Sequence, residues 1–159
     1  MPDRRPLLLA LLLAAVTVAV YWPALTSGFV NYDDDIYVSE RPEVRAGLSR
    51  EGVAWAFTSF QGANWFPLTR LSWMLDAEFF GLDPGAFHAT SLALHVANAL
   101  LLFLALLRLS GDPWPSAFAA GVFALHPLHV ESVAWVSTRK DVLSGTFFML
   151  ALLAHERCA

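Results

Sequence analysis

The chain has 159 residues, of which 57% are hydrophobic and 15% are charged, and its formal net charge is -4. Soluble globular domains carry charge on about a quarter of their residues, and nucleic-acid-binding domains present clustered Lys and Arg. The composition argues against both classes, so no nucleic-acid partner is expected. Because the apolar residues gather in long runs, we predict an all-α membrane protein with about four transmembrane helices.

The first apolar run covers residues 7–25, which at 1.5 Å per residue is long enough to cross a hydrocarbon layer of about 30 Å. Arg4 and Arg5 precede the run, and the next basic residue is Arg41. The positive-inside rule therefore predicts a cytoplasmic N-terminus. A cleaved signal peptide is the alternative, but the run is longer than a usual signal core and Pro23 interrupts the approach to a cleavage site.

Three consecutive carboxylates, Asp33, Asp34 and Asp35, follow shortly after this run. They repel one another, and the nearby lipid edge adds a desolvation cost, so the cluster is electrostatically expensive. Such a cluster can bind a cation, hold a substrate hydroxyl or act as a base. A solvated acidic turn at the end of the helix is the other interpretation, and the cluster alone does not decide between them.

The predicted external loop, residues 28–86, is rich in aromatic side chains and so is expected to fold rather than to remain a disordered tether. One helix is predicted to begin after the N-cap Ser49, and a second to begin at Pro67 and end before Gly81. The expected apolar faces are Val53, Phe57 and Phe60 on the first helix, and Leu68, Leu71, Leu75 and Phe79 on the second. These helices are expected to lie on the outer membrane interface or to pack over the bundle, and an ordinary packed extracellular subdomain is the alternative.

Three further apolar runs are predicted to span the membrane: residues 87–109, 116–136 and 141–155. Arg108 near the end of the second span fits a return to the cytoplasm, and the single cysteine, Cys158, excludes an internal disulfide. With only four spans, we expect residues 1–159 to be the N-terminal part of a larger polytopic protein.

Polar residues follow one side of the second span: His88, Ser91, His95 and Asn98. At membrane depth such residues face the bundle interior rather than lipid. We predict that Asn98 forms a hydrogen bond between helices and that His95 is a buried, satisfied histidine, with a role lining a cavity as the alternative.

A polar segment follows the apolar part of the third span. His126 is predicted to cap a new helix whose first residue is Pro127. His126, His129 and Glu131 suggest a metal site, but the signal is weak because His129 and Glu131 point to different faces. A divalent ion could also be assembled from an Asp of the first cluster and one of these histidines, so the need for a metal cofactor stays open.

Arg139 and Lys140 are predicted to lie on the outer side, against the usual distribution of basic residues. Cations placed there call for an anion. The neighbouring Asp141 is the local candidate, and a lipid phosphate is the alternative.

Three segments together carry a family resemblance: FVNYDDD at residues 29–35, ANWFPLT at residues 63–69, and HPLHVESVAWVSTRKD at residues 126–141. They resemble the N-terminal membrane half of the bacterial relatives of the transmembrane and tetratricopeptide-repeat-containing O-mannosyltransferases. That family is part of the GT-C glycosyltransferase superfamily. The resemblance covers nearly the whole chain, from about Trp22 to Arg157.

The resemblance implies transfer of a sugar from a polyprenyl-phosphate donor to a protein or glycan hydroxyl at the external face of a bacterial inner membrane. It also implies the functional residues: catalytic Asp33 and Asp34, with Asp35, Glu131, Arg139 and Lys140 at the substrates. Two alternatives remain from the sequence: a non-catalytic membrane anchor for a tetratricopeptide-repeat scaffold, and a transporter fragment with an intramembrane relay.

Overall fold

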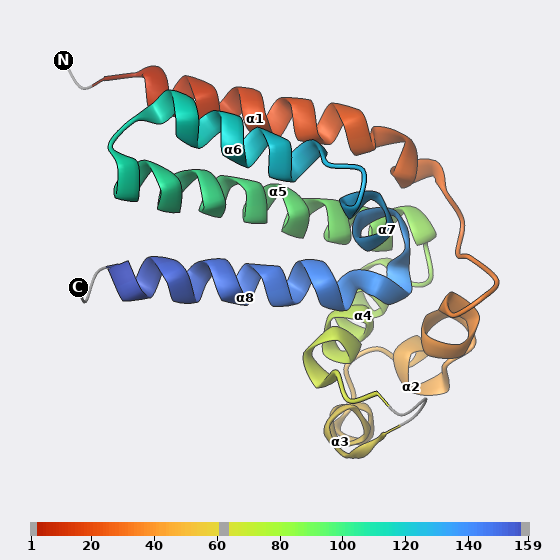
Figure 1. The fold of residues 1–159 in the computed structure, drawn as a ribbon. Coiled ribbons are helices and arrows are strands. Elements are labelled where there is room, and N and C mark those ends of the chain that lie inside the picture. The colour runs from red at the N-terminus through yellow and green to blue at the C-terminus, as the bar shows by residue number, and fades with distance from the viewer. Residues whose placement is uncertain (1–2, 61–63, 157–159) are drawn as a thin grey trace.

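A computed structural model describes residues 3–60 and 64–156, and these residues form helices and connecting turns without a β-strand. Residues 1–2, 61–63 and 157–159 lie outside the described part. Ala63 of the second motif and Cys158 are among these residues. Four of the helices run alongside one another as a bundle: α1 (Arg5–Tyr21), α5 (Pro84–Ser110), α6 (Pro113–Leu125) and α8 (Arg139–Glu156) (Figure 1).

The other helices, called the short helices although α4 has 14 residues, gather at one end of this bundle, opposite the start of α1 and the end of α8 (Figure 1). They are α2 (Pro42–Arg45), α3 (Arg50–Thr58), α4 (Pro67–Phe80) and α7 (His129–Ala134), with the turns η1 (Trp22–Thr26), η2 (Asp35–Ser39) and η4 (Val136–Thr138). The segments that carry the three motifs therefore meet at the same end of the molecule.

Two helical segments among the described residues are long and apolar enough to cross a membrane: Arg5–Thr26 and Pro84–Ser110. They correspond to the predicted spans 7–25 and 87–109. The predicted fourth span, 141–155, falls within α8, whose 18 residues are less apolar. The structure thus supports a helical membrane protein, and four spans remain a prediction.

The predicted third span, 116–136, is not a single helix. α6 ends at Leu125, His126 has an extended backbone with ψ 132°, and a new helix begins at His129 rather than at the predicted Pro127. Because a residue before proline is disfavoured in the helical conformation, Pro127 ends α6 instead of starting α7. The break turns the chain toward the short helices.

Small residues allow α5 and α6 to approach closely. Ala99, Ala120 and Ala124 are almost fully buried together with Leu13 of α1 and Phe103 of α5. Small side chains of this kind are typical of helix interfaces within membranes. A second cluster packs the short helices against the bundle; its buried members are Val38, Val44, Ala56, Trp73, Met74, Ala77, Phe87 and Val136.

The start of α3 and both boundaries of α4 are confirmed, but α3 ends at Thr58, before the predicted face residue Phe60, and the predicted buried face of α4 is wrong. Ser49 accepts a hydrogen bond from Gly52 N at 2.9 Å, as expected for an N-cap. On α4, however, Leu68, Leu75 and Phe79 are 47%, 43% and 70% exposed. The buried side instead carries Thr69, Arg70, Trp73, Met74, Asp76 and Ala77. This helix is apolar on an outer face because its inner face holds a polar network.

Candidate functional site

Asp34 joins the acidic segment to η4. The residue is fully buried, its Oδ2 accepts a hydrogen bond from Val30 N at 2.9 Å, and its Oδ1 accepts one from Ser137 N at 2.8 Å. The two amides lie far apart in the sequence, so this carboxylate connects the first motif with the third. Buried carboxylates need such partners, because an unpaired buried charge is costly.

The neighbouring carboxylates have different surroundings. Asp33 is half-buried, and its side chain forms no hydrogen bond or ion pair with the residues the structure describes. Asp35 accepts a local hydrogen bond from Ile36 N at 2.9 Å. The ring of Tyr32 packs against Trp135 with centroids 5.9 Å apart, which is a further contact between the two motifs. Asp33 is therefore the member of the cluster with both carboxylate oxygens free of partners among the described residues, whereas Asp35 has one oxygen engaged.

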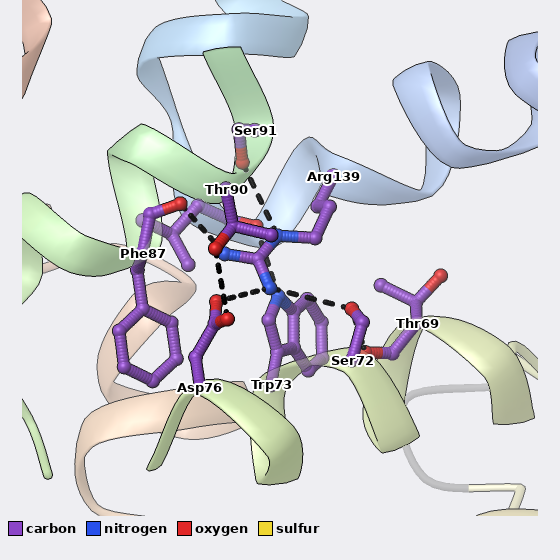
Figure 2. A network of polar contacts seen from close by, with 9 residues as sticks. Thr69, Ser72, Trp73, Asp76, Phe87, Thr90, Ser91 and Arg139 are labelled. Atoms are coloured by element: carbon purple, nitrogen blue, oxygen red, sulfur yellow. Dashed lines mark hydrogen bonds and ion pairs between the residues drawn. The ribbon is translucent and has the colours of Figure 1, made fainter. Parts of the chain in front are cut away.

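Arg139 lies at the centre of a buried polar network (Figure 2). Its Nη1 forms an ion pair with Asp76 Oδ2 at 2.6 Å, and its Nη2 donates to the Phe87 carbonyl oxygen at 2.7 Å. Further donated bonds reach Ser91 Oγ at 3.2 Å and Ser72 Oγ at 3.3 Å. The guanidinium group is fully enclosed, and its partners lie on α4 and α5.

Asp76 was not singled out from the sequence, although it is the partner of Arg139. Thr90 donates a hydrogen bond to Asp76 Oδ1 at 2.8 Å, so the carboxylate is held from both α5 and α8. Burial raises the pKa of the Asp76 carboxyl above its ordinary value, and the Arg139 charge and the Thr90 hydroxyl oppose that shift. From the sequence, Asp141 or a lipid phosphate was predicted as the anion beside Arg139. In the structure, the anion beside Arg139 is Asp76.

Arg70, a second buried arginine, joins neighbouring segments next to the second motif. Its guanidinium donates to the carbonyl oxygens of Ser59 at 2.7 Å and Ala56 at 3.3 Å, at the end of α3. It also stacks on Trp55, with its Cζ 4.5 Å from a ring centroid. Burial lowers the pKa of Arg70, and the nearby Arg41 charge lowers it further. The residue fixes the end of α3 against the beginning of α4.

Lys140 is exposed, in contrast to Arg139 beside it. It lines an apolar groove of about 440 Å³ that lies between α8 and the α3–α4 region. The other lining residues are Phe57, Trp65, Phe66, Pro67, Leu68, Thr69, Leu143, Ser144 and Phe147. Lys140 is the single charged residue of this lining, so the groove suits a molecule with a hydrocarbon portion and an anionic group.

Glu131 is exposed on α7, and its carboxylate has no hydrogen-bond or ion-pair partner in the described ranges. The ring of His129 packs against Phe123 with centroids 4.5 Å apart and lies 5.5 Å from the ring of His95. Across residues 3–60 and 64–156, no group of three or more His, Cys, Asp or Glu residues is arranged to hold a metal ion. The structure therefore gives the suggested metal site no ligand set.

The predicted polar face of the second span is confirmed. His88, Ser91, His95 and Asn98 are all buried. His95 Nε2 lies 2.9 Å from the Ala124 carbonyl oxygen, which makes it a satisfied buried histidine, and Asn98 Nδ2 donates to the Val142 carbonyl oxygen at 2.7 Å. As expected, the asparagine links two helices.

Sequence comparison finds relatives in animals. The chain is 30% identical to Protein O-mannosyl-transferase TMTC3 of Mus musculus, over 92% of its own length. It is 32% identical to Protein O-mannosyl-transferase TMTC1 of Homo sapiens over 93% of its length, and 38% identical to Protein O-mannosyl-transferase tmtc2 of Xenopus laevis over 57%. These similarities support a relationship to the family whose members carry that name.

The chain spans only a small part of these relatives: 16% of the mouse protein, 18% of the human protein and 11% of the frog protein. No family model matches the sequence. No solved structure matches it either.

Proposed function

We propose that the chain is part of a membrane glycosyltransferase of the GT-C superfamily, which transfers a sugar from a polyprenyl-phosphate donor to a protein or glycan hydroxyl. The names of the relatives support the reaction class and suggest mannose as the sugar. The observation that carries the proposal is the junction made by Asp34, which holds an acidic segment against the motif that contains Lys140.

In this proposal each of the three carboxylates of the acidic segment has a different role. Asp33 takes the proton of the acceptor hydroxyl as the oxygen attacks the anomeric carbon, and the bond from that carbon to the phosphate oxygen breaks. The electron pair leaves with the lipid phosphate. Asp34 holds Asp33 in place, since both Asp34 oxygens already accept backbone N–H bonds. Asp35, at the start of η2, contacts the acceptor.

The donor is held by the groove beside α8. Lys140 neutralises the phosphate, and the apolar lining takes the first units of the polyprenyl chain. Arg139 supports this position from inside, because its pairing with Asp76 fixes the first turn of α8. Glu131, whose carboxylate is exposed on α7, completes the substrate contacts at the same end of the bundle.

The proposal includes a location. Four spans would place the chain as a multi-pass protein in a bacterial inner membrane, with its N-terminus in the cytoplasm and the short helices outside. At that face both substrates would meet the acidic segment and the groove.

The test is a transfer assay in liposomes with the full-length protein of which this chain is proposed to be part, using polyprenyl-phosphate mannose and a peptide that contains Ser and Thr. Asp33→Asn should lower turnover by at least roughly a hundredfold, the usual scale for loss of a general base, without lowering the melting temperature. Asp35→Asn is the matched control and should matter less. Full turnover in the Asp33→Asn protein would remove the assigned base.

A further inference from the structure

A second cavity lies on the other side of α8, toward α5, α6 and α7. Its volume is about 590 Å³, and half of its lining residues are polar. The polar residues are His95, Asn98, His129, Ser132, Asp141 and Ser144. A cavity with a few polar groups among apolar ones is a candidate binding site, and the proposed roles of the acidic segment and the groove use neither the exposed Asp141 nor the half-buried His129.

The serine hydroxyl groups of this cavity already donate their hydrogen bonds to atoms of the protein. Ser132 Oγ donates to Asp141 Oδ2 at 3.2 Å, and Ser144 Oγ donates to the Asp141 carbonyl oxygen at 2.9 Å. Each hydroxyl oxygen keeps lone pairs, and the second carboxylate oxygen of Asp141 has no partner among the described residues. The lining thus presents acceptors rather than donors.

His129 extends this set of acceptors. Its ring is half-buried against Phe123, and neither ring nitrogen has a hydrogen-bond partner in the part of the chain that the structure describes. A neutral imidazole offers one acceptor nitrogen. On the opposite wall, Asn98 Oδ1 is buried and accepts no hydrogen bond from the described residues, although the Nδ2 atom of the same amide is paired.

We propose that this cavity binds a ligand through its hydroxyl groups, with Asp141 and His129 as the main acceptors. The inference deepens the proposed function and rests on it, because a sugar and a Ser or Thr acceptor share the O–H group that such a lining recognises. The apolar remainder of the lining, Leu128, Phe123, Phe148 and Met149 among it, suits the carbon face of a sugar ring or a peptide side chain.

Other ligand classes fit less well. The single formal charge of the lining is the negative Asp141, which disfavours a phosphate. A phosphate fits Lys140 in the groove, and Ser144 lines both spaces, so α8 forms the wall between them. The absence of a three-ligand group among the described residues also disfavours a metal ion.

The experiment measures ligand binding by saturation-transfer NMR, with the whole chain in detergent micelles. One arm uses methyl α-mannopyranoside, and the other uses a blocked peptide that contains Thr. Asp141→Asn should weaken the binding of the recognised ligand roughly tenfold, because it removes a charge-assisted hydrogen bond. His129→Phe keeps the packing on Phe123 but removes the acceptor nitrogen, and should weaken binding several-fold.

Lys140→Gln is the matched control, because Lys140 lines the groove and not the cavity. It should leave this binding unchanged while it weakens binding of a polyprenyl phosphate. Retained binding by the chain, together with no transferase activity in the full-length protein, would reject the proposed function but keep the cavity assignment. The assignment is overturned if neither probe binds, if both cavity variants bind like the parent with unchanged melting, or if tetramethylammonium displaces the probe.

Discussion

At the scale of single residues, three identical carboxylates in a row have three different environments. Asp34 is buried between two backbone amides, Asp33 is half-buried with free oxygens, and Asp35 bonds to the next residue. The sequence marks the cluster as a candidate site because repulsion makes it expensive, with a solvated acidic turn as the other interpretation. It cannot show which member is buried, since one partner of Asp34, Ser137, is distant in the chain.

We predict that Asp34→Asn destabilises the fold. The new amide must turn its NH₂ group toward Val30 N or Ser137 N, which leaves a buried donor facing a donor. The expected loss is about 1–3 kcal/mol of unfolding free energy. Thermal unfolding in detergent, with Asp35→Asn as the control, measures it. Equal melting temperatures for the two variants would contradict the bridging role.

At the scale of helices, α4 shows where periodicity fails. The apolar period marks Leu68, Leu75 and Phe79 as the inner face, but these residues are exposed. The inner face is chosen by partners that come later in the sequence: Arg139 pairs with Asp76, and the Val136 carbonyl accepts from Trp73 Nε1 at 3.3 Å. The start of α3 at the Ser49 cap and both ends of α4, at Pro67 and Gly81, were predictable from local signals, whereas the orientation of α4 depends on long-range pairing.

The ion pair between α4 and α8 gives a prediction about stability. Asp76→Asn leaves the Arg139 guanidinium buried without its anion and should cost about 3–5 kcal/mol of unfolding free energy. The double change Asp76→Asn with Arg139→Met should cost less, because it also removes the buried charge. The measurement is thermal or denaturant unfolding, and Glu51→Gln, on the exposed side of α3, is the control. A double variant that is less stable than Asp76→Asn would contradict the pairing.

Arg139 and Lys140, the first two residues of α8, are expected to have different roles: Arg139 in stability and Lys140 in binding the donor. Arg139→Lys should lower the melting temperature, because a point charge cannot replace a guanidinium that bonds to four partners. Lys140→Gln should leave melting unchanged and weaken binding of a polyprenyl phosphate roughly tenfold, the scale of one charge-assisted contact. Binding to the protein in nanodiscs, measured beside melting, distinguishes them. Unchanged affinity in Lys140→Gln would remove the groove from the donor site.

At the scale of the whole molecule, the apolar runs predict α1 and α5 well, because length and hydropathy are local properties. The break after α6 is less visible, since Pro127 permits either the start of a helix or its end. The candidate site depends on contacts between the first motif and the third. The predicted topology puts both motifs on one face of the membrane, but neither topology nor periodicity shows which residues make the contacts.

Orientation in the membrane is tested by labelling. In a chain whose Cys158 is replaced by Ser, a cysteine at Ser59 should react with an impermeant thiol reagent added to intact cells. A cysteine at Asp112, in the turn between α5 and α6, should react only after the cells are opened. Labelling of Asp112→Cys in intact cells would reverse the orientation and put the acidic segment on the cytoplasmic side.

The enclosed pair of Asp76 and Arg139 also constrains how the protein is made. During synthesis, Asp76 leaves the ribosome more than sixty residues before Arg139, so the carboxylate has no cation until α8 emerges. Neither charge can settle at the lipid edge alone without a large desolvation cost. If α8 enters the membrane as predicted, we therefore expect its first turn and the α4 region to close together late in synthesis, because each charge becomes enclosed only with its partner present.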